Sequence, residues 1–203
     1  MKTHFQSLLI PVFIFGLILT AIGCDSTPAD SGALDSEQMG RLRLLLTDAP
    51  FPFELVDSTN VTITRIEMVP ATDSLKRFVV STDTVMFNLL DLQNGVTAVL
   101  ADTTIPAGSY SQMRLLIQNA RIVLIDSSEF DLKIPSGSTS GLKILLRGFE
   151  IGVDSLTEMT LDFDLEKSFV VQGNPSTPAG IKGFHFKPVI KPIGYAPADS
   201  TGG

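Results

Sequence analysis

The stretch Met159-Thr160-Leu161-Asp162-Phe163-Asp164-Leu165-Glu166 decides the fold class, because apolar and polar residues alternate through all of it. A period of two places successive side chains on opposite faces of a β-strand, one face buried and the other in water. Residues 41–44 and most of residues 61–68 follow the same pattern. We therefore expect strands with one wet face, and Asp162, Asp164 and Glu166 to share that face.

Further runs rich in β-branched and aromatic residues follow between residues 78 and 190. They are separated by turn sequences such as Asn94-Gly95, Pro106-Ala107-Gly108 and Gly173-Asn174-Pro175, at spacings that suit a sandwich. The sequence predicts an antiparallel Greek-key β-sandwich, with a closed β-barrel as the second choice. A turn or two of helix is expected only around residues 96–102.

Cys24 is the only cysteine of the chain and follows a short apolar stretch. Lys2 precedes this stretch at residues 8–22, and Ala21-Ile22-Gly23 supplies the small residues that a signal peptidase requires. We expect residues 1–23 to be a lipoprotein signal peptide and Cys24 to be the lipid attachment site. The alternative is an uncleaved anchor helix, but the stretch is shorter than the roughly 20 residues that span a bilayer.

The predicted boundaries follow from composition. Residues 24–40 are acidic and poor in apolar side chains, which predicts a disordered tether. We expect residues 41–193 to form the sandwich and residues 194–203 to form a polar tail. The protein is expected outside the cytoplasm, anchored to a bacterial membrane at the periplasmic face or the cell surface. Asp25 next to the lipidated cysteine fits an inner-membrane retention signal, a surface-export signal or a plain spacer.

Charge and composition exclude several classes of ligand and site. The net charge is −7 and Lys and Arg form no run, so a nucleic-acid partner is not expected. One cysteine leaves no internal disulfide and no thiolate metal cluster. The chain has no Trp and only Tyr110 and Tyr195, which makes a carbohydrate partner unlikely because sugar rings stack on such side chains.

Catalysis is not expected, although two arrangements of residues are compatible with it. His185 lies between Phe184 and Phe186, and the alternation places it on the solvent-exposed face of a strand. The sequence does not show whether a serine and an aspartate come close to it in the fold, because the members of a Ser-His-Asp site need not be close in sequence. Asp162, Asp164 and Glu166 could supply paired carboxylates, so a hydrolase that uses this acidic strand face is the further alternative. A polar strand face accounts for the same residues.

No cofactor is expected, and calcium is the alternative considered. Asp162 and Asp164, together with Asp48, are weak candidates for calcium ligands, because Ca²⁺ binds about six to eight oxygens. A solvated face accounts for them equally, as do salt bridges to basic residues elsewhere in the chain, namely Arg65, Arg114 and Lys143. Asp48 also fits turn chemistry, with its carboxylate accepting from nearby backbone amides before Pro50.

Residues 49–56 form the one loop-like segment rich in aromatic residues and proline. Phe51 and Phe53 either plug an open end of the sandwich or form an exposed contact for a partner protein. They are the weak candidates for partner binding.

Five segments of the chain carry a resemblance to a known family: Leu44-Leu45-Leu46-Thr47-Asp48-Ala49-Pro50, Phe87-Asn88-Leu89-Leu90-Asp91-Leu92-Gln93-Asn94-Gly95, Ile105-Pro106-Ala107-Gly108-Ser109-Tyr110, Ile134-Pro135-Ser136-Gly137 and Leu161-Asp162-Phe163-Asp164. They run in the expected order over about residues 40–192, and they resemble a bacterial lipoprotein family catalogued as domain of unknown function 4382. The resemblance implies a secreted, often lipid-anchored β-sandwich without an established activity or ligand. The corner before Tyr110 is similar to that of transthyretin-like and carboxypeptidase-regulatory-like sandwiches, so a transthyretin-like or immunoglobulin-like sandwich is expected.

These observations together predict a lipid-anchored, non-catalytic binding or structural module at the bacterial cell envelope. A protein partner is favoured, in addition to the membrane reached through Cys24. The alternatives are a calcium-stabilised extracellular module and the hydrolase.

Overall fold

Strands form nearly all of the regular structure in the computed structural model, which describes residues 38–48, 54–74, 76–134 and 140–197. All of them belong to the unit Glu37–Gly203. The strands are β1 Met39–Asp48, β2 Val56–Pro70, β3 Phe78–Ser81, β4 Val85–Asn88, β5 Ala98–Pro106, β6 Gly108–Leu124, β7 Glu129–Asp131, β8 Leu142–Ile151, β9 Leu156–Phe163, β10 Phe169–Gly173, β11 Ile181–Phe186 and β12 Ile190–Pro197. The helical turns are η1 Leu89–Leu92, α1 Leu165–Ser168 and η2 Pro178–Gly180.

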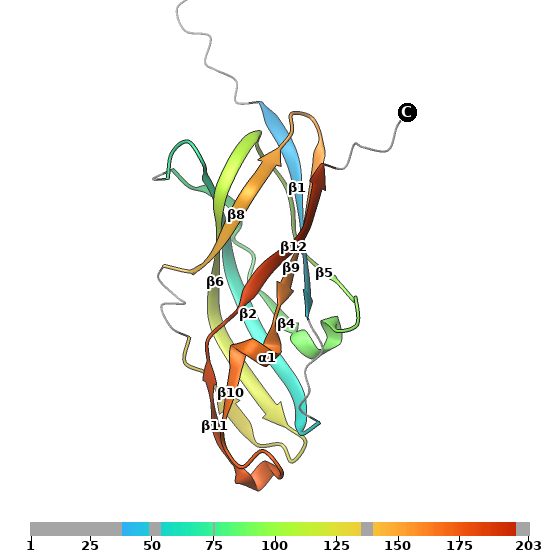
Figure 1. Ribbon diagram of the computed structural model, residues 1–203, viewed down its shortest axis with the longest axis vertical. Coiled ribbons are helices and arrows are strands. Elements are labelled where there is room, and N and C mark those ends of the chain that lie inside the picture. The colour runs from blue at the N-terminus through green and yellow to red at the C-terminus, as the bar shows by residue number, and fades with distance from the viewer. Residues whose placement is uncertain (1–37, 49–53, 75, 135–139, 198–203) are drawn as a thin grey trace, which may run out of the picture. The chain divides into compact units, whose positions relative to one another are not determined.

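The strands form two open sheets and a hairpin (Figure 1). Sheet A has the order β12-β9-β1-β5, and sheet B has the order β3-β2-β6-β7, with β4 also paired to β2 and β8 to β6. Strands β10 and β11 form the separate hairpin. The predicted all-β sandwich is therefore confirmed, and within the described residues neither sheet closes into the barrel that was the second choice.

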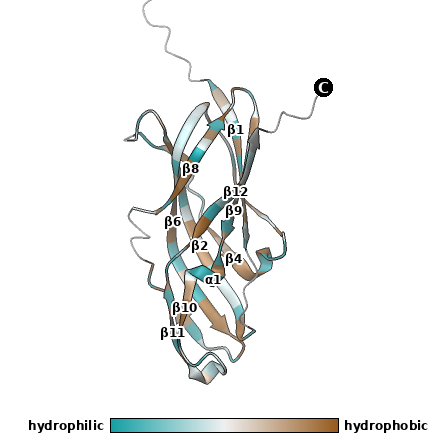
Figure 2. Ribbon diagram, in the orientation of Figure 1, coloured by the Kyte–Doolittle hydropathy of each residue, from teal (hydrophilic) through white to brown (hydrophobic). Residues whose placement is uncertain are grey.

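The core lies between the inner faces of the sheets. In β9, the side chains of Thr157, Met159, Leu161 and Phe163 are buried, while the residues between them are partly exposed, as the alternation predicts. Hydrophobic and hydrophilic residues accordingly intermix along the strands (Figure 2). The edges of the two sheets meet where Tyr195 of β12 donates a hydrogen bond to the backbone oxygen of Arg147 in β8.

One ladder of sheet A differs from the antiparallel expectation. Strand β9 pairs in parallel with β1, from Arg41 opposite Leu156 to Asp48 opposite Phe163. The turn before β9 is fixed at the start of β1, where the Arg41 amide donates to the Ser155 oxygen at 2.8 Å. Since β9 enters sheet A at the end where β1 begins, the two strands run in the same direction.

The predicted strand over residues 159–166 is too long at its C-terminal end. Strand β9 ends at Phe163 because the Asp164 side chain accepts a hydrogen bond from the Lys167 amide at 3.1 Å and caps the single turn of α1. Glu166 is therefore exposed on α1 and does not share a strand face with Asp162.

The helix expected around residues 96–102 is also wrong, because these residues lead into β5. The helical turn is instead η1, where the Asn88 side chain accepts from the Leu90 amide at 3.3 Å. In the part of the chain that the structure describes, no helix is long and apolar enough to cross a bilayer.

The β10–β11 hairpin packs against both sheets through aromatic contacts. Phe186 of β11 stacks on Phe163 and Phe169, with ring centroids 6.3 and 4.8 Å apart. Phe184 meets Phe130 of β7 edge to face at 5.4 Å. Phe130 is the ladder partner of the buried Ile122, so the hairpin packs on the inner face of sheet B near β7.

Candidate functional site

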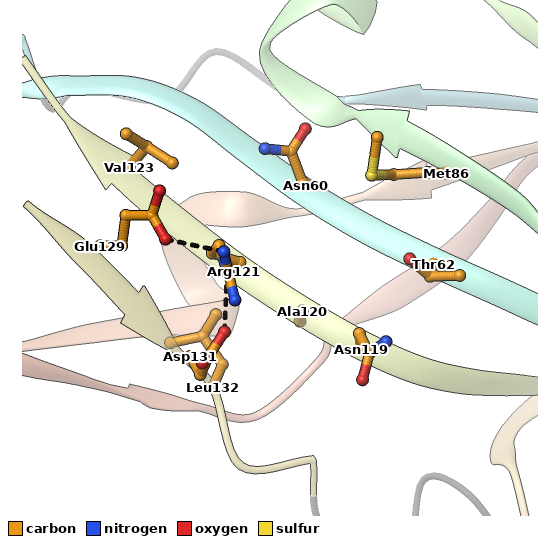
Figure 3. A pocket seen from close by; sticks show the side chains of 10 residues that line it. All are labelled: Asn60, Thr62, Met86, Asn119, Ala120, Arg121, Val123, Glu129, Asp131 and Leu132. Atoms are coloured by element: carbon orange, nitrogen blue, oxygen red, sulfur yellow. Dashed lines mark hydrogen bonds and ion pairs between the residues drawn. The ribbon is translucent and has the colours of Figure 1, made fainter. Parts of the chain in front are cut away.

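A pocket of about 620 Å³ lies on the outer face of sheet B (Figure 3). We call it the Arg121 pocket. Its floor comes from the adjacent strands β2 and β6, and its sides come from the short strands β4 and β7. The lining residues are Asn60, Thr62, Met86, Asn119, Ala120, Arg121, Val123, Glu129, Asp131 and Leu132.

Strand register places the polar side chains of the pocket side by side. Thr62 of β2 lies between Met86 of β4 and Asn119 of β6, its partners in the two ladders. Asn60 is the partner of Arg121 in the same way. Directly paired residues of an antiparallel ladder project to the same side of the sheet, so these side chains share the outer face while Val61 and Ile122 enter the core.

Two carboxylates fix the guanidinium group of Arg121. Its Nε donates to Asp131 Oδ1 and its Nη1 to Glu129 Oε2, both at 2.7 Å. The Asp131 carboxylate, followed by Glu129, raises the pKa of Arg121 further above its ordinary value. These exposed ion pairs contribute little to folding, but together they hold one wall of the pocket in a defined position.

The side chains that line the pocket can both donate and accept hydrogen bonds. The amides of Asn60 and Asn119 each offer donors and an acceptor, and the Thr62 hydroxyl does the same. Met86 adds an apolar surface that is 66% exposed. A volume of this size falls within the range of sites for small ligands, and the open, polar lining suits a polar ligand or a segment of another chain.

The structure brings the three candidate calcium ligands together at the C-terminal end of β1. Asp162 of β9 is the ladder partner of Thr47, next to Asp48, and Asp164 follows β9. Asp48 is only 3% exposed, and its Oδ1 accepts from the Leu165 amide at 3.3 Å. Burial, with smaller contributions from Asp162 and Asp164, raises the pKa of Asp48 to about 7.

Asp164 is already neutralised by lysines. Lys167 Nζ lies 2.6 Å and Lys191 Nζ 3.4 Å from Asp164 Oδ2. Burial opposes ionisation of Asp164, but its hydrogen bonds with Lys167 hold the pKa below the ordinary value. Among the residues that the structure describes, no three His, Cys, Asp or Glu side chains are arranged to hold a metal ion. Calcium binding stays a prediction.

The ion pairs shown for Asp164 are with Lys167 and Lys191, and not with the basic residues expected as salt-bridge partners. Arg65 pairs with Glu67 at 2.7 Å, and Arg114 donates to the Ser140 backbone oxygen at 3.0 Å, both on sheet B. Lys143 lies across the ladder from Arg114. Sheet topology places these basic residues on sheet B, whereas Asp162 and Asp164 belong to the end of sheet A.

The remaining candidates fall into two groups. Cys24, Phe51 and Phe53 lie outside the described residues. His185 is exposed on β11, where its Nε2 contacts the side-chain nitrogen of Gln172. Tyr110 is buried, and its hydroxyl donates to the Pro106 oxygen at 2.6 Å, which fixes the corner before β6.

Sequence reasoning did not identify the Arg121 pocket. The usable signal was the row of polar residues at outward positions of the predicted strands, such as Thr62 and Arg121. This signal does not reveal which strands are neighbours, and the pocket depends on β4 and β7 flanking β2 and β6.

Comparison with known proteins identifies a family. A family model described as Domain of unknown function (DUF4382) matches residues 39–188, which is more than half of the chain. No curated protein matches the chain. No solved structure matches it either. The matched region begins with β1 and ends just before β12. The chain therefore belongs to the family of domain of unknown function 4382.

Proposed function

We propose that this protein is a non-catalytic binding module of the bacterial cell envelope, and that the Arg121 pocket recognises a partner protein. The observation that carries the proposal is the pocket itself, an opening of about 620 Å³ lined by amide, hydroxyl and guanidinium groups on the outer face of sheet B. Its lining is suited to recognition by hydrogen bonds.

The composition of the pocket favours a protein partner. The amides of Asn60 and Asn119 match the donors and acceptors of a peptide backbone. Arg121 and Met86 belong to residue types that are enriched at protein interfaces. Met86 also adapts its flexible thioether side chain to the surface that covers it.

The expected location supports the same function. The stretch before Cys24 has the features of a lipoprotein signal, and a lipidated cysteine would hold the domain at a membrane. The acidic residues that follow would serve as a spacer between the lipid and the domain. The pocket would then be available to proteins of the envelope.

Photo-cross-linking in the native host tests this function. A p-benzoylphenylalanine residue in place of Met86 is expected to give an adduct of one discrete mass, while the same probe at Val99, exposed on sheet A, is not. Asn119→Arg places a large side chain in the pocket and should abolish the Met86 adduct. The matched control is Gln118→Arg, because Gln118 is exposed beside Asn119 but does not line the pocket. An adduct that survives Asn119→Arg would contradict the proposal.

A further inference from the structure

A second polar region lies on the outer face of sheet B, near β8 and β3, and is basic although the protein is acidic. We call it the basic strip. Glu67 of β2, Arg114 of β6 and Lys143 of β8 are successive partners across the ladders, so their side chains lie in one row. The guanidinium groups of Arg65 and Arg77 adjoin Glu67. The basic strip therefore contains four cations, and the row across the ladders contains one carboxylate.

The one carboxylate of the row is already engaged. Glu67 is 7% exposed, its Oε1 accepts from Arg65 Nε at 2.7 Å, and its Oε2 accepts from Arg77 Nη1 at 3.4 Å. Both oxygens are thus directed to arginines other than Arg114. The charge of Arg114 is left without a counter-ion on this strand pair.

Among the described residues, the hydrogen bond of Arg114 goes to a neutral group, and the residue forms no ion pair. Its Nη1 donates to the neutral backbone oxygen of Ser140 at 3.0 Å. Its Nε is buried and has no hydrogen-bond partner among the described residues, and neither has the side-chain nitrogen of Gln112, two positions earlier on the same face. A partly buried cation and two unpartnered donors are costly unless an acceptor with negative charge lies nearby.

Lys143 adds a second positive charge to the same place. It is exposed and lies directly opposite Arg114, and within the described part of the chain no carboxylate forms an ion pair with it. Like charges directly opposite each other destabilise a ladder. By contrast, Arg121 on the same face is paired with two carboxylates, so the arrangement at Arg114 is a local feature and not a property of the whole sheet.

We propose that Arg114 and Lys143 bind the phosphate group of a phosphate-bearing anion, with Arg65 and Arg77 adding to the positive potential. A guanidinium and an ammonium side by side provide charge-assisted hydrogen bonds to phosphate oxygens. The phosphate could belong to a lipid headgroup or to a free anion, since the chemistry that the site recognises is the same. The inference does not depend on the Arg121 pocket.

Titration calorimetry on the purified full chain in an uncharged detergent tests the site at low ionic strength, where exposed charges are least screened. The probes are inorganic phosphate and glycerophosphoglycerol, the soluble headgroup of an anionic lipid. Saturable binding of either probe, weakened at least about tenfold by Arg114→Gln or Lys143→Gln, supports the site. Tighter binding of glycerophosphoglycerol identifies a lipid headgroup, and tighter binding of phosphate identifies a free anion.

The control is Arg41→Gln, which removes a guanidinium of sheet A that is already paired with Asp102 and should leave phosphate binding unchanged. Lys143→Gln keeps the test decisive if Arg114→Gln does not fold, because Lys143 is exposed. The proposal is overturned if neither probe binds, or if Lys143→Gln and Arg41→Gln weaken binding equally.

Discussion

Phe163→Ala should lower the free energy of unfolding by about 3–5 kcal/mol, as replacement of a buried phenylalanine by alanine does elsewhere. Phe163 is 0% exposed and is the last residue of β9. Its ring lies parallel to that of Phe186 on β11, with an interplanar angle of 4°. The substitution removes the side chain that joins sheet A to the β10–β11 hairpin and leaves a cavity between them.

Urea unfolding, followed by circular dichroism, measures this effect. Val99→Ala is the control, because Val99 is 59% exposed on β5 and its truncation should change stability by no more than about 0.5 kcal/mol. If Phe163→Ala cost less than about 1 kcal/mol, the hairpin would not be packed on the sandwich as described.

Asp48 should make the protein less stable as the pH rises from about 4 to about 7. Its pKa is raised from 3.8 to about 7 in the folded state, so between these values the folded protein holds a proton that the unfolded chain has released. Stability therefore falls with rising pH in this window, by at most about 1.4 kcal/mol per pH unit, and levels off above pH 7. The carboxyl is neutral at acid pH, and ionisation then places a charge in a buried site.

The charged groups that face Asp48 also favour a loss of stability as the pH rises. Asp162 and Asp164 disfavour a third negative charge, whereas the Leu165 amide and the Gln93 side chain stabilise it only in part. Asp164 acts in the opposite direction because its pKa is lowered, but its contribution is lost only as the pH falls below the ordinary range of a carboxyl. Of these two carboxyls, Asp48 therefore governs the pH dependence between about pH 4 and about 7.

Asp48→Asn should remove most of this pH dependence and make the protein more stable than the wild type above pH 7, by about 2–4 kcal/mol. The asparagine keeps an acceptor for the Leu165 amide and carries no charge. Urea unfolding at a series of pH values gives the free energy of unfolding of the wild type and of Asp48→Asn. Asp83→Asn, at an exposed carboxylate, serves as the control. A wild-type stability that rises between pH 5 and 7 would contradict the role given to Asp48.

The alternation of apolar and polar residues was sufficient to predict the strands and the sandwich, because burial of one strand face is a local property of the sequence. It predicted the buried side of β9 down to Phe163. It failed immediately afterwards, because Asp164 fits the same period but acts as a helix cap through its contact with the Lys167 amide. A polar residue such as aspartate suits both a helix cap and a solvent-exposed strand position, so its residue type alone does not distinguish the two.

Contacts between distant parts of the chain could not be predicted. The sequence predicts that the Asp48 carboxylate accepts hydrogen bonds from nearby backbone amides. In the structure it accepts from the amide of Leu165, which lies 117 positions further along the chain. The parallel pairing of β1 with β9 produces this contact. The Arg121 pocket has the same origin, since Thr62 and Asn119 become neighbours only through the β2–β6 register.

The affinity of the cross-linked partner for the purified chain tests the central claim most directly. Calorimetry should give a Kd that rises at least about tenfold for Asn119→Arg, because a large charged side chain then occupies the Arg121 pocket. Gln118→Arg should leave the Kd within about twofold of the wild-type value, since smaller differences correspond to well under 1 kcal/mol. Equal affinities of the wild type and Asn119→Arg would contradict the claim that this pocket is the recognition site.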